Sequence, residues 1–168
     1  DRTWRVLVLD RGVLDQAHQR KLRSILEGLG FVPLAAGVFV SPQAASEEVK
    51  KQLMEANLDG AVTMVEPKRF VVGDDRAFAS RIWRLDELVE RQRQLISRSD
   101  KLLNVVRRAK TLTDQHKLAY NKVNFEWFRL LLEVPGLPLK LLPSDWPHLE
   151  ARTMMVKLGR AVRELEEE

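Results

Sequence analysis

A proline-rich segment near the C-terminal end of the sequence constrains this chain more than any other feature. Residues 126–151 hold four of the seven prolines and two of the four tryptophans. Pro135 lacks a backbone N–H and disfavours a helical residue before it, so the preceding helix is predicted to stop at Val134. Ser144 is a good N-cap for another helix, and Pro147 fits the first turn of that helix. The segment is therefore predicted to form a corner between two helices.

The connection inside this corner is too apolar for a free loop. Connecting segments normally run over the surface, where polar residues suit them. We therefore expect this one to be pinned onto a core. A corner that only packs its own leucines remains the plain alternative to a functional one. The leucines concerned are Leu137, Leu139, Leu141 and Leu142.

The residues of the corner resemble the C-terminal signature of PaaX-family transcriptional repressors, which control phenylacetic acid catabolism. That signature reads roughly Asp-Pro-x-Leu-Pro-x-x-Leu-Leu-Pro-x-Asp-Trp-Pro-Gly. The resemblance extends upstream through Trp83 and Leu85 to Trp4, Arg5 and Val6, and so covers nearly all of the chain. The matching residues here are Leu137-Pro138 and Leu141-Leu142-Pro143-Ser144-Asp145-Trp146-Pro147.

Two positions depart from the family pattern. Phe125 stands before Glu126-Trp127-Phe128 where the family usually has His before Glu-Tyr-Arg, and Val134 stands where the family has Asp before the first proline. Any ligand contact made by those family residues is therefore not expected at these positions.

Composition places the chain among ordinary globular proteins. Hydrophobic residues make up 45% of the 168 residues and charged residues 31%. The sequence contains no run of eighteen apolar residues and no charged-then-apolar leader, so we expect no membrane span, no signal peptide and a cytoplasmic location. The absence of cysteine excludes disulfides and thiolate metal sites. The chain begins at Asp1 without a methionine, directly before a strand-like run, so we expect a further segment upstream.

The first seventy-odd residues alternate between strand and helix patterns. Strands are predicted at residues 3–9, 31–35, 38–40 and 61–65, with helices from about 14 to 29 and from 46 to about 56. The order β-α-β-β-α-β is typical of a ferredoxin-like domain, an antiparallel sheet with two helices on one face. In the PaaX family the corresponding segment resembles the small CRISPR adaptation nuclease. We assign residues 1–74 to this domain.

No strand pattern recurs after residue 74, and residues 75–168 are predicted to form an all-helical C-terminal domain. The fold class is therefore α+β. The first 75 residues carry ten basic and eleven acidic residues, whereas the remainder carries eighteen basic and thirteen acidic residues. The basic excess is concentrated in residues 76–110, which either form a solvated helical face or bind phosphates.

Asp10 is the one residue with a candidate metal role. It ends the first strand, where the resemblance implies the metal-binding aspartate of the CRISPR nuclease. A single aspartate is a poor Mg²⁺ site unless a homodimer brings two together. The structural interpretation, a turn cap or a pair with Arg11, is the one we favour. A metal-dependent nuclease using Asp10 across a homodimer stays open as the alternative.

No other catalytic or cofactor motif is present. The sequence has no glycine-rich phosphate loop or Walker lysine, so we expect neither a cofactor nor an enzyme. The three histidines, His18, His116 and His148, are each interpreted as solvated surface groups.

The resemblance implies the regulatory portion of a repressor. In such a protein an N-terminal winged-helix module reads DNA, and the present chain would form a homodimer and sense an aryl-CoA effector such as phenylacetyl-CoA. Aromatic residues between helices could leave a pocket for a flat ring, with arginines for phosphates. A non-catalytic dimerisation module is the remaining alternative. The candidate effector-binding residues are Trp83, Arg84, Trp127, Arg129 and Trp146.

Overall fold

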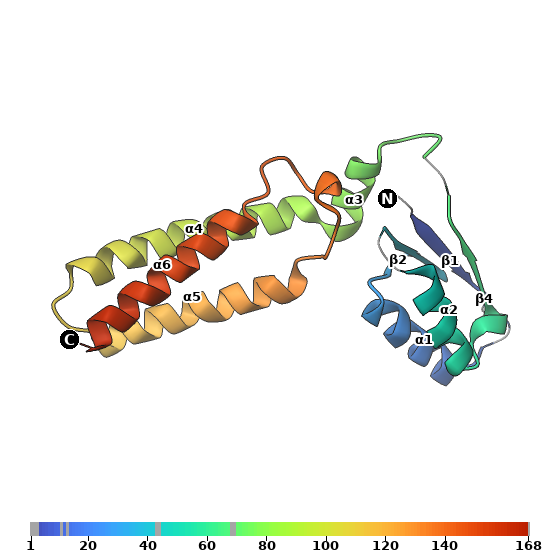
Figure 1. Ribbon diagram of the computed structural model, residues 1–168, viewed down its shortest axis with the longest axis horizontal. Helices are drawn as coiled ribbons and strands as arrows, with labels where there is room; N and C mark the ends of the chain where they lie inside the picture. Colours follow the sequence, from blue (N-terminus) through green and yellow to red (C-terminus); the bar gives the residue numbers. More distant parts are fainter. Residues whose placement is uncertain (1–3, 11, 13, 43–44, 68–69, 168) are drawn as a thin grey trace. The chain divides into compact units, whose positions relative to one another are not determined.

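The computed structural model in Figure 1 describes residues 4–10, 12, 14–42, 45–67 and 70–167. Strands and helices alternate in the first part of the chain, and helices alone follow. In chain order the elements are β1 (Arg5–Leu9), α1 (Gln16–Gly28), β2 (Val32–Ala35), β3 (Val38–Ser41), α2 (Ser46–Glu55), η1 (Asp59–Ala61), β4 (Val62–Val65), α3 (Asp75–Trp83), α4 (Leu85–Arg108), α5 (Asp114–Glu133), η2 (Leu139–Leu141) and α6 (His148–Glu167).

The strands form one antiparallel sheet with the order β2-β3-β1-β4. The central strand β1 pairs with β3 on one side and with β4 on the other, so that Leu7 lies opposite both Phe39 and Met64. The observed element order β-α-β-β-α-β is the predicted one. With the helical part that follows, it confirms the predicted α+β class.

Helices α1 and α2 cover one face of this sheet (Figure 1) and supply its hydrophobic core. Alternate strand residues point to that face, and the helices meet it with leucines and valine at helical spacing. The buried cluster consists of Leu7, Leu22, Leu26, Phe31, Phe39, Val49, Leu53 and Leu58.

Local signals in the sequence set the ends of these elements. Asp15 caps α1, because its carboxylate accepts a hydrogen bond from the backbone N–H of His18 at 2.8 Å. Gly30 ends the helix region with φ of 78°, and Gly37 makes the β2-β3 turn with φ of 82°. Such positive φ values favour glycine.

By internal contacts the chain divides into two compact units. The sheet unit comprises residues 1–82 and 136–142, and the helical unit comprises residues 83–135 and 143–168. The predicted division after residue 74 placed α3 in the helical domain, whereas the division by internal contacts places nearly all of α3 in the sheet unit. Phe78 of α3 packs edge-on against Trp4, with ring centroids 5.1 Å apart, and Phe70 packs against the same tryptophan at 5.6 Å. This aromatic cluster joins α3 to the sheet unit.

Part of the proline-rich corner also belongs to the sheet unit. The Arg76 guanidinium donates to the backbone carbonyl of Lys140 at 3.1 Å. Leu137, Leu141 and Leu142 are buried, as the expectation of a pinned segment requires, whereas Leu139 is largely exposed.

The helix after the corner begins later than the sequence suggested. We predicted Ser144 as its N-cap, but α6 starts at His148. The backbone N–H of Trp146 donates to the carbonyl of Pro143 at 3.2 Å, so residues 143–146 form a turn. The Pro147 carbonyl then accepts the first helical hydrogen bond, from Ala151 at 2.9 Å.

The helical unit consists of α4, α5 and α6 lying side by side (Figure 1). Its boundaries follow from capping. Thr113 and His116 form a capping box at the start of α5, and Val134 caps the end, before Pro135, as predicted. Arg84 precedes α4 in a left-handed conformation with φ of 51°.

The core of the helical unit repeats every three to four residues on each helix. In α4 this buried stripe includes two polar side chains, Gln92 and Ser99, both fully buried. Ser99 donates to the Met155 sulfur of α6 at 3.4 Å. Within the described residues, no helix is both long and apolar enough to cross a lipid bilayer.

Candidate functional site

A cleft of about 520 Å³ lies between α5 and α6 in the helical unit. Both helices pack on α4 but contact each other little, which leaves the space between them open. The side chains of α5 that line it follow helical spacing and so share one face. The lining residues are Tyr120, Asn124, Trp127, Phe128 and Leu131 of α5 with His148, Arg152, Met155, Val156, Gly159 and Arg163 of α6.

Gly159 of α6 lies at the point in the cleft where α6 faces Tyr120 of α5. A Cβ atom at this position would lie 3.2 Å from the Tyr120 hydroxyl oxygen, which is tighter than an ordinary van der Waals contact. A larger side chain here would therefore project toward α5 and fill part of the cleft.

Aromatic rings form much of the surface of the cleft. The Trp127 indole is buried and stacks on the His148 imidazole, with ring centroids 5.6 Å apart and an interplanar angle of 28°. Phe128 is 56% exposed, so its ring is accessible from solvent. Flat π surfaces of this kind favour stacking or edge contacts with another ring.

Polar groups complete the lining. Arg152 and Arg163 are exposed at the cleft, and neither pairs with a carboxylate within the described part of the chain. Their guanidinium groups can bind phosphate or carboxylate in a bidentate manner. The cleft can therefore hold a molecule with a flat ring at one end and an anionic group at the other.

His148 is not the solvated surface group that the sequence suggested. Its imidazole is half-buried, because it stacks on Trp127, and its Nδ1 atom is buried without a hydrogen-bond partner among the described residues. His18 is exposed beside Asp15, as predicted. His116 lies in the first turn of α5 and is partly exposed, and its Nδ1 accepts a hydrogen bond from the Thr113 backbone N–H at 3.4 Å.

Ion pairs between α4 and α5 hold the α5 wall in place. Arg91 donates to both carboxylate oxygens of Glu133, one of them at 3.1 Å, and Arg98 donates to Glu126 at 2.9 Å. The hydrogen bonds from Arg91 lower the pKa of Glu133 below its ordinary value, although partial burial acts in the opposite direction. The same pair raises the pKa of Arg91.

The structure places the five predicted effector-binding residues at different points. Trp127 alone lines the cleft. Arg129 lies on another side of α5, near Arg91 and Lys122. Trp83 ends α3 and is half-buried, Arg84 donates to Glu87 at 2.8 Å, and Trp146 is half-buried in the turn before α6.

Asp10 has the turn-capping role that the structural interpretation gave it. Its side-chain oxygen accepts a hydrogen bond from the Gly12 backbone N–H at 3.0 Å. Arg11, the other predicted partner, lies outside the described residues. Over the described ranges, no group of three or more His, Asp or Glu side chains is arranged to hold a metal ion. The homodimeric nuclease alternative stays a prediction.

Sequence reasoning found part of the cleft. Tyr120 and Phe128 belong to the aromatic residues that were expected to leave a pocket between helices, although they were not among the candidate effector-binding residues. Arg152 and Arg163 were not singled out, and His148 was assigned to the surface. The helical spacing of Tyr120 and Phe128 with Trp127 indicates a shared face of α5. Nothing in the spacing of α6 indicates which of its faces meets α5.

Comparisons with known proteins cover both parts of the chain. Residues 1–79 match the family model described as the PaaX protein central Cas2-like domain, and residues 83–168 match the PaaX-like protein C-terminal domain. A search of curated proteins found no significant match.

Among solved structures, an uncharacterized protein, Rv0674 from Mycobacterium tuberculosis, is similar with a TM-score of 0.65. The two are 22% identical, and the match covers 98% of this chain and 62% of the other. At that identity the likeness shows the fold alone. The present chain thus spans less than two thirds of the length of this relative.

Proposed function

The chain belongs to the PaaX family, and on that premise we propose that it is the dimerising, effector-sensing body of a transcriptional repressor. At the level of the family it is a PaaX-like regulatory protein. The observation that supports effector sensing is the aromatic cleft between α5 and α6, whose lining includes two arginines without an ion pair among the described residues.

The proposed effector is an aryl-CoA thioester such as phenylacetyl-CoA. Its ring would stack against Trp127 and Phe128, and its phosphates would pair with Arg152 and Arg163. The volume of about 520 Å³ lies within the range of 300 to 1,000 Å³ usual for small-molecule sites. A long thioester would extend beyond the cleft into solvent, so only the aryl end is expected to be enclosed.

Effector sensing requires a difference in affinity between two states of the regulator. A ligand that bound the DNA-binding and released states equally well would shift no equilibrium, however tightly it bound. The proposed mechanism is that a ring inserted between α5 and α6 fixes their separation and so favours one state. DNA reading itself is assigned to the winged-helix module that the family resemblance implies.

Homodimerisation is proposed through the sheet unit. On the sheet face away from α1 and α2, Val8 and Val65 are about half exposed, although both are apolar. A second copy covering these valines would remove apolar surface from water, which is favourable. Light scattering of the purified chain at several concentrations measures the mass directly, and a mass of one chain throughout would contradict a dimer.

Thermal melts with phenylacetyl-CoA test the effector proposal. A ligand that binds only the folded protein raises the midpoint, by about 2.7 kcal/mol of stabilisation at a hundredfold excess over its Kd. We expect the wild-type midpoint to rise, and to rise less for Phe128→Ala, which removes an exposed ring from the cleft. Leu132→Ala on the same helix is a matched control, because Leu132 is 88% exposed and does not line the cleft. An unchanged wild-type midpoint would contradict effector sensing and favour the dimerisation module over the sensor.

The nuclease alternative has its own test. Wild-type and Asp10→Ala proteins are incubated with Mn²⁺ and labelled DNA or RNA. Cutting that disappears with the aspartate would favour the enzyme, and no cutting by either protein would remove it.

A further inference from the structure

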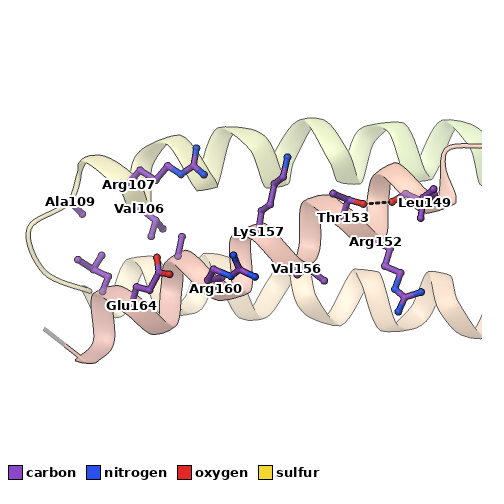
Figure 2. Close-up of a pocket in the computed structure, with 12 residues that line it drawn as sticks. Val106, Arg107, Ala109, Leu149, Arg152, Thr153, Val156, Lys157, Arg160 and Glu164 are labelled. Carbon is purple, nitrogen blue, oxygen red and sulfur yellow. Dashed lines mark hydrogen bonds between the residues drawn. The ribbon is translucent and has the colours of Figure 1, made fainter.

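A second concave surface of the helical unit lies between the C-terminal part of α4 and α6 (Figure 2). This groove has a volume of about 700 Å³. Apolar side chains and four cationic side chains line it, and Glu164 is the one carboxylate among the described residues of the lining. The cations are Arg107 of α4 with Arg152, Lys157 and Arg160 of α6.

None of these four cations has a carboxylate partner within the described ranges, and the same holds for Lys101, Arg108, Lys110, Lys122 and Arg163 elsewhere in the unit. Arg91, Arg93 and Arg98, nearer the start of α4, each pair with an acidic residue. A solvated helical face would account for exposed cations, but it does not account for their concentration beside a groove with almost no acidic counterpart.

The cations are spread along the groove instead of converging on one point. Arg152 and Arg160 are eight residues apart on α6, which corresponds to about 12 Å at a rise of about 1.5 Å per residue. Figure 2 shows the Lys157 side chain extending toward α4, where Arg107 lies. An extended row of unpaired cations matches a linear polyanion better than a compact one, and each strand of duplex DNA carries a phosphate about every 3.4 Å of helix axis.

We propose that the α4/α6 groove binds the phosphate backbone of duplex DNA, as a sequence-independent contact in addition to the winged-helix module. DNA is the polyanion that a regulatory protein of this family would meet. Contacts of cations with phosphates position a protein on DNA without reading bases. This contact goes beyond the proposed effector site, because Arg107, Lys157 and Arg160 do not line the α5/α6 cleft, whereas Arg152 lines both surfaces.

The salt dependence of binding gives the expected size of the effect. Four phosphate contacts predict a slope of about −3.6 in a plot of log K against log salt, or about a 150-fold loss of affinity between 50 and 200 mM NaCl. Removing three of the cations leaves a slope of about −0.9, or about a 3.5-fold loss over the same range.

The experiment is fluorescence anisotropy of a labelled random-sequence duplex with the full chain over this salt range. The test variant combines Arg107→Gln, Lys157→Gln and Arg160→Gln. The matched control combines Lys21→Gln, Arg23→Gln and Lys50→Gln, which are exposed in α1 and α2 and change the net charge equally. We expect the slope to fall in the test variant and to stay near the wild-type value in the control.

Three outcomes would overturn the proposal. The first is that wild type does not bind the duplex at 50 mM NaCl. The second is that both variants lose the same amount of slope. The third is that the test variant loses binding to vesicles of anionic phosphatidylglycerol but keeps its binding to DNA. Titration of the test variant with phenylacetyl-CoA separates this proposal from the effector site, because the cleft is intact and its affinity should be unchanged.

Discussion

Replacing Gln92 by methionine should stabilise the helical unit. Gln92 is fully buried in the core stripe of α4, and neither its amide oxygen nor its amide nitrogen has a hydrogen-bond partner among the described residues. Each unsatisfied buried polar group costs about 1–3 kcal/mol. Methionine has a similar length and a similar helix propensity and buries no unsatisfied amide.

We therefore expect Gln92→Met to raise the free energy of unfolding by about 2 kcal/mol. In urea denaturation followed by helical circular dichroism, this corresponds to a midpoint increase of about 1 M for an m-value of about 2 kcal/mol/M, with the m-value unchanged. Gln94→Met is the control, because Gln94 is exposed on the same helix and its substitution should stay within about 0.5 kcal/mol. A Gln92→Met protein less stable than wild type would refute the reasoning, since it would mean that the amide is hydrogen-bonded in solution.

Three further predictions concern the fold. Glu133→Gln should destabilise the protein most above the ordinary glutamate pKa near 4.5. Because Arg91 lowers the folded-state pKa of Glu133, the stabilisation is lost as the pH falls from 4.5 through that lower value, so the difference between the two proteins in melts should shrink from pH 7 to pH 3. Equal differences at pH 3 and pH 7 would contradict this. Thr113→Ala removes the N-cap of α5 and should cost about 1 kcal/mol in urea denaturation, whereas Thr113→Ser should cost much less. Leu141→Ala should cost about 2–5 kcal/mol, because Leu141 is buried, while Leu139→Ala, at an exposed position, should cost under about 0.5 kcal/mol.

Local chemistry explains why much of the fold could be predicted from the sequence. Pro135 ends α5 at Val134, Gly37 makes a hairpin turn, and Thr113 caps a helix through atoms only a few residues away. Such signals act within one or two turns of chain, so a sequence pattern records them directly.

The start of α6 shows where local reasoning failed. Ser144 is a good N-cap residue, but the Trp146 N–H bonds to the Pro143 carbonyl and completes a turn, so the helix begins only at His148. Two local structures competed for the same residues, and propensity alone did not decide between them.

The candidate site depends on which helices meet, and this information is non-local. Trp127 could be nominated because aromatic residues with helical spacing mark a face of α5. The stacking of His148 on Trp127 requires the chain to reverse through the proline-rich corner, and so does the proximity of Gly159 to Tyr120. The spacing of residues along one helix contains neither fact.

The central claim is that the cleft between α5 and α6 encloses the aryl end of the effector. Isothermal titration with phenylacetyl-CoA and with CoA alone tests it most directly. The proteins compared are wild type, Gly159→Leu, whose new side chain fills the cleft, and the control Gly28→Leu, where a Cβ added at Gly28 would meet open space. Burial of a phenyl ring contributes about 1.5–3 kcal/mol, so wild type and the control should prefer phenylacetyl-CoA by about tenfold or more. Gly159→Leu, confirmed as folded by circular dichroism, should lose that preference. A preference retained in Gly159→Leu, or absent from wild type, would contradict the account.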